Sequence, residues 1–195
     1  MKEHRINALD DFICGWYLDD TTICDKLIAY HKNHPEKHAG TVASRKTGTA
    51  IDKSAKDSMD VGLLGDLFIE YNKVLMLVMP RYIEKFPMCN YYSPWGLREG
   101  INVQYYNPGG AYHAWHTERT SSIGHNTTRH LVFMTFLNDV TDGGETEFLH
   151  QKLKVGAEKG LTVFWPADWT FTHRGVVSPS QEKYIVTGWL NYFND

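Results

Sequence analysis

The stretch Ile101-Asn102-Val103-Gln104-Tyr105-Tyr106 is followed at once by Asn107-Pro108-Gly109-Gly110. An apolar and aromatic run of this length, ended by Pro and Gly, is typical of a β-strand that closes in a turn. Further runs of the same kind cover residues 130–137, 146–149, 161–165 and 184–193. Short strands separated by Gly, Pro and Asn indicate a β-sandwich or a double-sheet barrel. This half of the chain, from about residue 89, therefore predicts a jelly-roll core.

The region before residue 89 is predicted to be mainly helical. Asp19-Asp20-Thr21 offers N-cap chemistry ahead of apolar residues at helical spacing, and this first helix should stop before Pro35. Ser58 or Asp60 is then expected to cap a second helix. Helices in this position would cover one outer face of the β core.

The second predicted helix has apolar residues at a period of 3.6 residues, and Pro80 is expected to kink or end it. Its apolar residues are Val61, Leu64, Leu67, Phe68, Tyr71, Val74, Leu75 and Val78. The expected fold is mostly β with α, a cupin-like double-stranded β-helix buttressed by N-terminal helices. We predict one domain over residues 1–195, with a helical support layer and loop over 1–88 and the jelly-roll core over 89–195.

Residues 35–57 are polar and are expected to form a long exposed loop between the two helices. Loops of this length are often lids or binding loops, and a solvated connection is an equally good interpretation. The basic residues of this loop are Arg45, Lys46, Lys53 and Lys56. The histidines near its start are expected to form a solvated cluster rather than a metal site, and they are His31, His34 and His38.

Composition gives no support to several classes of function. The formal net charge of −3 gives no support for binding to nucleic acid or to an acidic membrane surface. The 3 cysteines are scattered, which favours free thiols in a reducing compartment. The charged start of the chain leads into no long apolar run, and no stretch is apolar enough to span a membrane. A cytoplasmic protein is therefore expected.

His116 and Glu118 are the first candidate metal ligands. Side chains two positions apart in a strand point to the same side, so these two can converge on one ion. Such a pair is common by chance, and a surface pair is its default interpretation. His173, far downstream, would lie beside them if a late strand passes an early one. Two imidazoles and one carboxylate leave part of the coordination sphere open, as Fe(II) oxygenases require.

Lys183 is the next candidate, at the start of the apolar run over residues 184–189. A lysine that points into a barrel is costly unless an anion meets it. The alternative is that Lys183 precedes the strand and faces water, as most lysines do. Periodicity does not decide between these two positions.

Taken together, residues 100–193 resemble the 2-oxoglutarate- and Fe(II)-dependent oxygenases, within them the prolyl 4-hydroxylase-like group. The resemblance rests on ordered blocks, namely Tyr106-Asn107-Pro108-Gly109-Gly110-Ala111-Tyr112, Gly143-Gly144-Glu145-Thr146-Glu147-Phe148, His173-Arg174-Gly175-Val176-Val177, Lys183 and Trp189. It implies hydroxylation of a C–H bond, with Fe(II), 2-oxoglutarate and O2, and with ascorbate as a further requirement of some relatives.

The resemblance also implies roles for particular residues. His116, Glu118 and His173 would hold iron, and Lys183 would pair with the distal carboxylate of 2-oxoglutarate. Tyr106 matches a tyrosine that binds this cosubstrate, although Tyr105 is an equally available neighbour. The pair Gly143-Gly144 is similar to the tight turn that precedes a strand in the family, and Gly175 would let the backbone pass close to the site.

Glu118 departs from the family pattern, which has aspartate at this position. Glutamate keeps the charge that suits Fe(II) but adds one methylene. Two other functions therefore stay open: a cupin-like module that binds a metal or small ligand without oxidation, and a zinc hydrolase. The substrate is expected to be a peptide or protein, with a small molecule as the alternative. An aromatic groove for it, or core and rim packing, would involve Tyr91, Tyr92, Trp95, Tyr112 and Trp115.

Overall fold

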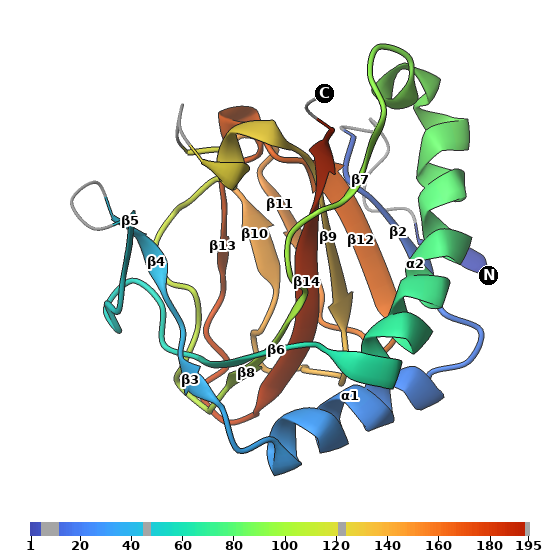
Figure 1. Ribbon diagram of the computed structural model, residues 1–195. Helices are drawn as coiled ribbons and strands as arrows, with labels where there is room; N and C mark the ends of the chain where they lie inside the picture. Colours follow the sequence, from blue (N-terminus) through green and yellow to red (C-terminus); the bar gives the residue numbers. More distant parts are fainter. Residues whose placement is uncertain (5–11, 45–47, 121–123, 194–195) are drawn as a thin grey trace.

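The computed structural model describes residues 1–4, 12–44, 48–120 and 124–193. Within these residues a 9-stranded antiparallel sheet has the order β1-β2-β12-β9-β14-β8-β6-β3, and β7 also pairs with β14 (Figure 1). A smaller sheet has the order β11-β10-β13, and β4 and β5 form a hairpin. The chain is therefore mostly β, with antiparallel pairing throughout the described sheets.

The elements have the following bounds. In the first half they are β1 (Lys2–His4), β2 (Cys14–Tyr17), α1 (Thr22–Asn33), β3 (His38–Ala39), β4 (Val42–Ser44), β5 (Gly48–Ala50), β6 (Met59–Gly62), α2 (Gly65–Lys85), η1 (Pro87–Asn90) and β7 (Trp95–Leu97). In the second half they are β8 (Asn102–Tyr106), η2 (His125–Thr128), β9 (Arg129–Phe136), β10 (Thr146–Phe148), β11 (Leu153–Val155), β12 (Leu161–Pro166), η3 (Trp169–Phe171), β13 (His173–Gly175) and β14 (Lys183–Tyr192).

The large sheet separates two hydrophobic clusters because alternate residues of a strand face opposite sides. In β9, Leu131 and Phe133 face a cluster that includes both helices, while Val132, Met134 and Phe136 face the smaller sheet. Figure 1 shows the helices on one side of the large sheet and β10, β11 and β13 on the other. The molecule thus has helices, the large sheet and the small sheet as successive layers.

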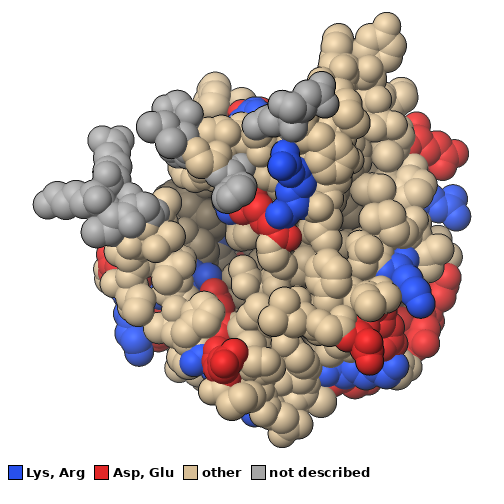
Figure 2. Space-filling view, viewed as in Figure 1, with Lys and Arg blue, Asp and Glu red and all other residues tan. Residues whose placement is uncertain are grey.

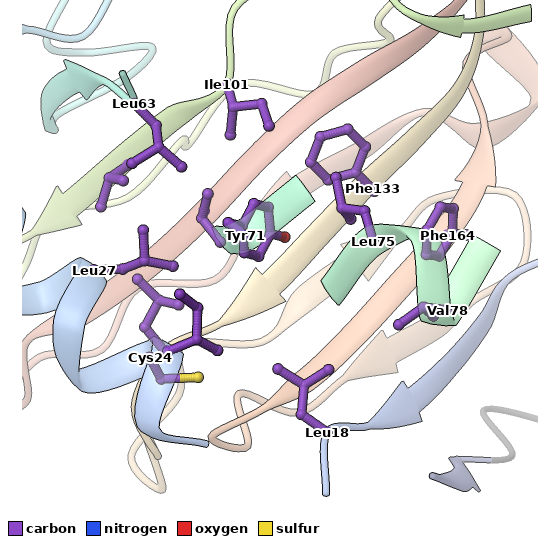
Figure 3. Packing of buried hydrophobic residues seen from close by; sticks show 14 of the residues in the cluster. Leu18, Cys24, Leu27, Leu63, Tyr71, Leu75, Val78, Ile101, Phe133 and Phe164 are labelled. Carbon is purple, nitrogen blue, oxygen red and sulfur yellow. The ribbon is translucent and has the colours of Figure 1, made fainter. Parts of the chain in front are cut away.

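The helices cover one face of the large sheet, as the apolar spacing predicted. Tyr71 and Leu75 of α2 pack against Phe133 and Phe164 of the sheet (Figure 3). The hydroxyl of the buried Tyr71 also forms a hydrogen bond of 2.8 Å with Thr135. A buried hydroxyl with a partner is tolerated in an apolar layer, so α2 is fixed both by packing and by this bond.

The start of α1 agrees with the sequence, since Asp20 Oδ1 accepts hydrogen bonds from the backbone N–H and the hydroxyl of Thr22 at 2.8 and 2.6 Å. The prediction for the second helix was wrong at its start, and of the two outcomes expected at Pro80 the structure excludes an end to the helix. Ser58 and Asp60 do not cap it, because Met59–Gly62 is a strand and α2 begins at Gly65. The helix also continues through Pro80, which lies on its exposed side, where water can satisfy the carbonyl that proline leaves free.

The prediction of a helical layer over residues 1–88 was incomplete, because strands of this region join the large sheet. β2 pairs with β12, and β6 pairs with β8. The stretch 35–57 is not simply an exposed loop either, since it contains β3, β4 and β5 and ends in the buried Lys56. Arg45 and Lys46, which were assigned to this loop, lie outside the described residues.

The prediction of a solvated histidine cluster is wrong for His31, whereas His38 is exposed as expected. His31 is only 3% exposed, and its Nε2 lies 2.9 Å from the backbone oxygen of Met59. Its ring lies between Tyr105 and Tyr184, so packing of α1 on the sheet buries it. Cys14, Cys24 and Cys89 form no disulfide bond with one another, in agreement with the prediction of reduced thiols. Among the helices described, none has the length and apolar character needed to cross a membrane.

Candidate metal centre and pocket

His116 and His173 are brought together by backbone hydrogen bonds. Each donates its N–H to the carbonyl oxygen of the other, at 3.0 and 2.9 Å. His173 begins β13 and pairs with Phe148 of β10, whereas His116 lies in an irregular segment that touches β13 through an isolated bridge. The predicted proximity of these histidines is therefore confirmed, although the segment of His116 and Glu118 is not the regular strand that the sequence suggested.

Glu118 lies against both histidines. Candidate ligand atoms of His116, Glu118 and His173 all lie within 4.8 Å of one another. Glu118 Oε1 is 3.6 Å from Nε2 of His116 and 3.5 Å from Nε2 of His173. The Nδ1 atoms of the two imidazoles lie 2.9 Å from the backbone oxygens of Ala114 and Phe171 respectively. A proton on each Nδ1 would leave both Nε2 lone pairs directed at one point, as metal-binding histidines need.

The protonation states of His116 and Glu118 also suit the binding of a cation. Burial, together with the neighbouring His173, lowers the pKa of His116 to about 3, so this imidazole is neutral near pH 7. Burial acts to raise the pKa of Glu118, but hydrogen bonding from His173 and the charges around it, Arg129 among them, hold that pKa at about 2. Neutral imidazoles and an ionised carboxylate are the forms that bind metal ions.

The second oxygen of Glu118 has partners of its own. Oε2 accepts a hydrogen bond of 2.9 Å from the indole nitrogen of Trp189 in β14. Arg129 of β9 lies 3.5 Å from the same oxygen and donates to the backbone oxygen of Glu118 at 3.0 Å. The guanidinium stacks on Trp189, with 3.6 Å to the ring centroid, and its charge is paired with Glu99 at 2.5 Å. Trp189 was already part of the family resemblance, whereas no spacing in the sequence singled out Arg129 or Glu99.

The cluster forms part of the wall of a cavity of about 240 Å³. Figure 2 shows a hollow on this face of the molecule, with acidic and basic side chains around it. The residues that line the cavity include the predicted site residues, which are Tyr106, His116, Glu118, His173 and Lys183. Thr41 to Ala43 and Thr49, from the region of the β4–β5 hairpin, line it as well.

Lys183 points into the cavity and does not face water, the two positions between which the sequence could not decide. It pairs with Tyr106 across β14 and β8 and is 5% exposed. Its Nζ donates to the backbone oxygen of Gly144 at 3.0 Å and lies 5.1 Å from the ring centroid of Tyr106. Burial lowers the pKa of Lys183 to about 8. Tyr105 packs on Tyr184 at 4.8 Å and does not line the cavity, so of these two neighbours it is Tyr106 that lines it.

Glycines shape the backbone around this lysine and around His173. Gly143 and Gly144 both have φ near 80°, a conformation that side chains disfavour, and this turn places the Gly144 carbonyl at Lys183. Gly175 donates its N–H to the carbonyl of Tyr112 at 2.8 Å, and a side chain on Gly175 would crowd that backbone. The turn and the close approach expected at these glycines are both present.

The cavity has one basic side chain that differs from the others. Lys56, Arg129 and Arg174 each have a carboxylate within salt-bridge distance, namely Asp60, Glu99 and Glu147. Lys183 has no such carboxylate among the residues that the structure describes. Burial disfavours the ammonium form of Lys183, and the charge of Glu145, which lies outside salt-bridge distance, opposes this only in part. An anion that entered the cavity would therefore be stabilised at Lys183.

The expected aromatic groove is present only in part. Tyr112 lines the cavity and stacks on His116, with ring centroids 3.6 Å apart. Trp115 lies outside the cavity wall and stacks with Arg174, Trp95 is buried, and Tyr91 and Tyr92 are largely exposed away from the cavity lining. The sequence could not separate them, because aromatic residues serve cores, rims and sites alike.

Two antiparallel sheets that enclose two imidazoles, a carboxylate and a buried lysine form an arrangement that suits metal-dependent oxygenases, which leave ligand positions open for substrates. Residues 101–191 match the family model described as the 2OG-Fe(II) oxygenase superfamily, and this region contains the predicted site residues. The match confirms the resemblance found in the sequence, to oxygenases that use Fe(II), 2-oxoglutarate and O2.

Among the solved structures with the same fold are prolyl hydroxylases. The viral collagen prolyl hydroxylase of Paramecium Bursaria Chlorella virus-1, in its 2OG complex, is 18% identical, with a TM-score of 0.68 and coverage of 95% of this chain and 98% of that one. A prolyl-4-hydroxylase of Pseudomonas putida is 16% identical, with a TM-score of 0.68 and coverage of 95% of both chains.

A prolyl hydroxylase of Trichoplax adhaerens, in complex with a peptide fragment of the hypoxia inducible factor oxygen degradation domain, has a TM-score of 0.72. It is 16% identical and covers 95% of this chain and 84% of that one. The search among curated proteins gives no match. At these identities the solved structures establish a shared fold.

Proposed function

We propose that this chain is an Fe(II)- and 2-oxoglutarate-dependent dioxygenase that hydroxylates a C–H bond in a peptide or protein, with a prolyl side chain as the first candidate. The observation that carries this proposal is the meeting of His116, Glu118 and His173 at one end of a cavity that also contains Lys183. The sheets around the cavity fit a double-stranded β-helix, the fold expected from the sequence.

The residues present suit the metal. His116 and His173 would each bind through Nε2, since their Nδ1 atoms face backbone oxygens. Glu118 would bind through Oε1, because Oε2 already accepts a hydrogen bond from Trp189. Nitrogen and carboxylate donors in this ratio suit Fe(II). Bound iron, with 2-oxoglutarate and O2, supplies the oxidation of the C–H bond, with succinate and CO2 as co-products.

The rest of the cavity suits a dicarboxylate. Lys183 is the lining cation that lacks a carboxylate partner among the described residues, and Tyr106 lies beside it. A carboxylate that reached Lys183 would form a charge-assisted hydrogen bond away from water. The protein would thereby orient the opposite end of 2-oxoglutarate toward the metal ligands and exclude water from the reaction. Ascorbate would serve to restore oxidised iron.

A peptide substrate is supported by the structural relatives, among them the Trichoplax adhaerens prolyl hydroxylase in complex with a peptide fragment. In the present chain the cavity is open to the surface on the side shown in Figure 2, and Tyr112 offers an aromatic face next to His116. A small molecule that enters the same cavity remains the alternative substrate.

The test is the formation of succinate from 2-oxoglutarate with Fe(II) and O2, with proline-containing peptides searched for the addition of one oxygen. His116→Ala, Glu118→Ala and His173→Ala should each abolish succinate formation. His130→Ala is the matched control, because His130 is a half-buried histidine outside the cavity lining that contacts the Cys89 oxygen at 2.8 Å. Full turnover in the three ligand variants would reject the proposal.

The same assay distinguishes the second candidate, a module that binds metal or a small ligand without oxidation. This alternative is motivated by Glu118, which stands where the family has aspartate. Such a module would bind Fe(II) and 2-oxoglutarate but would form no succinate, with or without peptide. An oxygenase would show at least uncoupled decarboxylation of 2-oxoglutarate.

A further inference from the structure

Lys56 and Asp60 form a buried ion pair in the cavity wall, apart from the candidate metal ligands. Their side chains are 5% and 6% exposed, and Lys56 Nζ lies 2.6 Å from Asp60 Oδ2. Both residues line the cavity, together with Gln104 and Tyr106 of the neighbouring strand. Neither residue was predicted to belong to the site, because Lys56 lies in a stretch expected to be exposed and Asp60 was expected to cap a helix.

The ion pair is hydrogen-bonded and tightly packed by neighbouring residues. Ser58 donates its hydroxyl to the other oxygen of Asp60 at 2.7 Å, so both carboxylate oxygens are occupied. Gly40 is buried beside the pair, and a Cβ at Gly40 would lie 2.1 Å from Ser58 Oγ and 2.8 Å from Lys56 Cε. A glycine is therefore required where the backbone crosses this site. The pair is part of the packed wall and is not a surface contact.

Lys56 is also tied to the segment that carries the candidate ligands. It forms a β-bridge with Tyr112, and its ammonium lies 5.6 Å from the centroid of the Tyr112 ring. That ring stacks on His116 with an angle of 7° between the planes. Lys56 thus lies near the metal end of the cavity, whereas Lys183 is set against the Gly144 turn and Tyr106.

A buried ion pair contributes little net stability, because desolvation of the two charges offsets their attraction. Replacement of such a pair by apolar residues often leaves the free energy of unfolding unchanged. Stability therefore does not explain the pair, and its place in the cavity wall points to a role in substrate recognition. An ammonium has three N–H donors, and Asp60 is its hydrogen-bonding carboxylate here. The other N–H groups of Lys56 need acceptors, and a substrate that enters the cavity would supply one.

We propose that Lys56, held by Asp60, donates a hydrogen bond to a backbone carbonyl oxygen of the peptide substrate next to the residue that is oxidised. This inference rests on the proposed function and specifies how its substrate is positioned. The partner is a neutral carbonyl because Asp60 already balances the charge of Lys56. An anionic group would instead be drawn to Lys183, which lacks a carboxylate partner among the described residues.

The experiment compares variants in a coupled assay with a proline-containing peptide that the wild-type chain oxidises. Lys56→Met would leave Asp60 buried and unpaired, so the main variant is the double substitution Lys56→Met with Asp60→Asn, which removes both charges and keeps the contact to Ser58. Lys53→Met is the matched control, since Lys53 forms a similar i,i+4 pair with Asp57 but is 73% exposed.

The double variant should lower kcat/KM for the peptide by at least about tenfold, the effect of a lost charged hydrogen bond, and should increase succinate formed without peptide oxidation. The KM for 2-oxoglutarate, the affinity for metal and the melting temperature should stay close to wild type, as should all properties of Lys53→Met. The peptide affinity of Lys56→Arg should lie between that of the double variant and that of the wild type.

Two results would overturn the inference. One is an unchanged kcat/KM for the peptide in the double variant. The other is a loss of metal affinity equal to the loss in peptide turnover, which would mean that Lys56 merely supports Tyr112 and His116. A wild-type chain that oxidises no peptide would overturn this inference and the peptide part of the proposed function together, whereas an unchanged double variant overturns this inference alone.

Discussion

Trp189→Phe provides the most direct test of how the protein fixes its candidate iron ligand. The indole N–H of Trp189 donates to Glu118 Oε2 at 2.9 Å, and the guanidinium of Arg129 stacks on the same ring. Phenylalanine keeps an aromatic face for Arg129 but removes the donor. Glu118 would then lose the partner that keeps Oε2 away from the metal and Oε1 toward it.

The expected loss follows from the kind of bond removed. A hydrogen bond to a charged acceptor contributes about 1.5–3 kcal/mol, and removal of a group that orients a ligand typically weakens metal binding by about 10–100-fold. Arg129 still lies 3.5 Å from Oε2 and can take over part of the contact. We therefore expect the affinity for Fe(II) or Co(II) to fall by about tenfold, toward the lower end of that range.

The measurement is an anaerobic calorimetric titration with each metal, which does not depend on turnover. Trp95→Phe is the matched control, because Trp95 donates an indole bond of 2.8 Å to the Cys89 oxygen and pairs with the same strand, β14, outside the cavity lining. That variant should keep the metal affinity of the wild type. Equal affinities in wild type and Trp189→Phe, or equal losses in both variants, would refute the reasoning.

Three further outcomes follow from the same geometry. Lys183→Met should raise the KM for 2-oxoglutarate by at least about tenfold. The melting temperature should not fall, because the substitution removes a buried charge. An unchanged KM in steady-state assays would exclude Lys183 as the residue that binds the distal carboxylate. The KM for 2-oxoglutarate should rise by up to about tenfold per pH unit as the pH increases above the Lys183 pKa of about 8, because the ammonium is the form that binds an anion. Lys183→Arg is the control, and its KM should not change over the same pH range. Fe(II) at about 100 times its Kd should raise the melting temperature by roughly 5–10 °C in anaerobic calorimetry, and this rise should vanish with a chelator or in His173→Ala.

Much of the β half could be predicted because its signals are local. The run from Ile101 to Tyr106 ends at Pro and Gly, and the strand β8 covers Asn102–Tyr106. The apolar run from residue 184 became β14, which begins one residue earlier at Lys183. The meeting of His116 and His173 could be predicted because ordered blocks, and not single residues, carried the resemblance.

The first half was harder because tertiary contacts overrode local preference. Val61 fits a helical period with Leu64 and Leu67, yet it pairs with Val103 in the large sheet. A period of 3.6 residues can include a short strand whose apolar residues happen to fit it. The exposed Leu64 at the start of α2 is consistent with this, since the true helix begins only at Gly65.

The ion pairs of the cavity could not be predicted for a different reason. Lys56 and Asp60 are four residues apart in a polar stretch, a spacing that usually marks a solvated pair. Arg129 and Glu99 are joined only because β9 and the segment before β8 meet in space. Charged residues are exposed in most proteins, so their burial can be known only once the sheets are assembled.

The glutamate that weakened the family resemblance has a physical role in this structure. Its longer side chain comes from the irregular segment after His116, which is joined to β13 by a bridge and is not held in a regular strand. From there one oxygen lies within 3.6 Å of both imidazoles while the other accepts from Trp189. Aspartate, shorter by one methylene, would have to give up one of these contacts unless the backbone moved inward. Glu118 therefore links the candidate metal centre to β14, the strand that also carries Lys183, and the departure from aspartate is compatible with a working oxygenase.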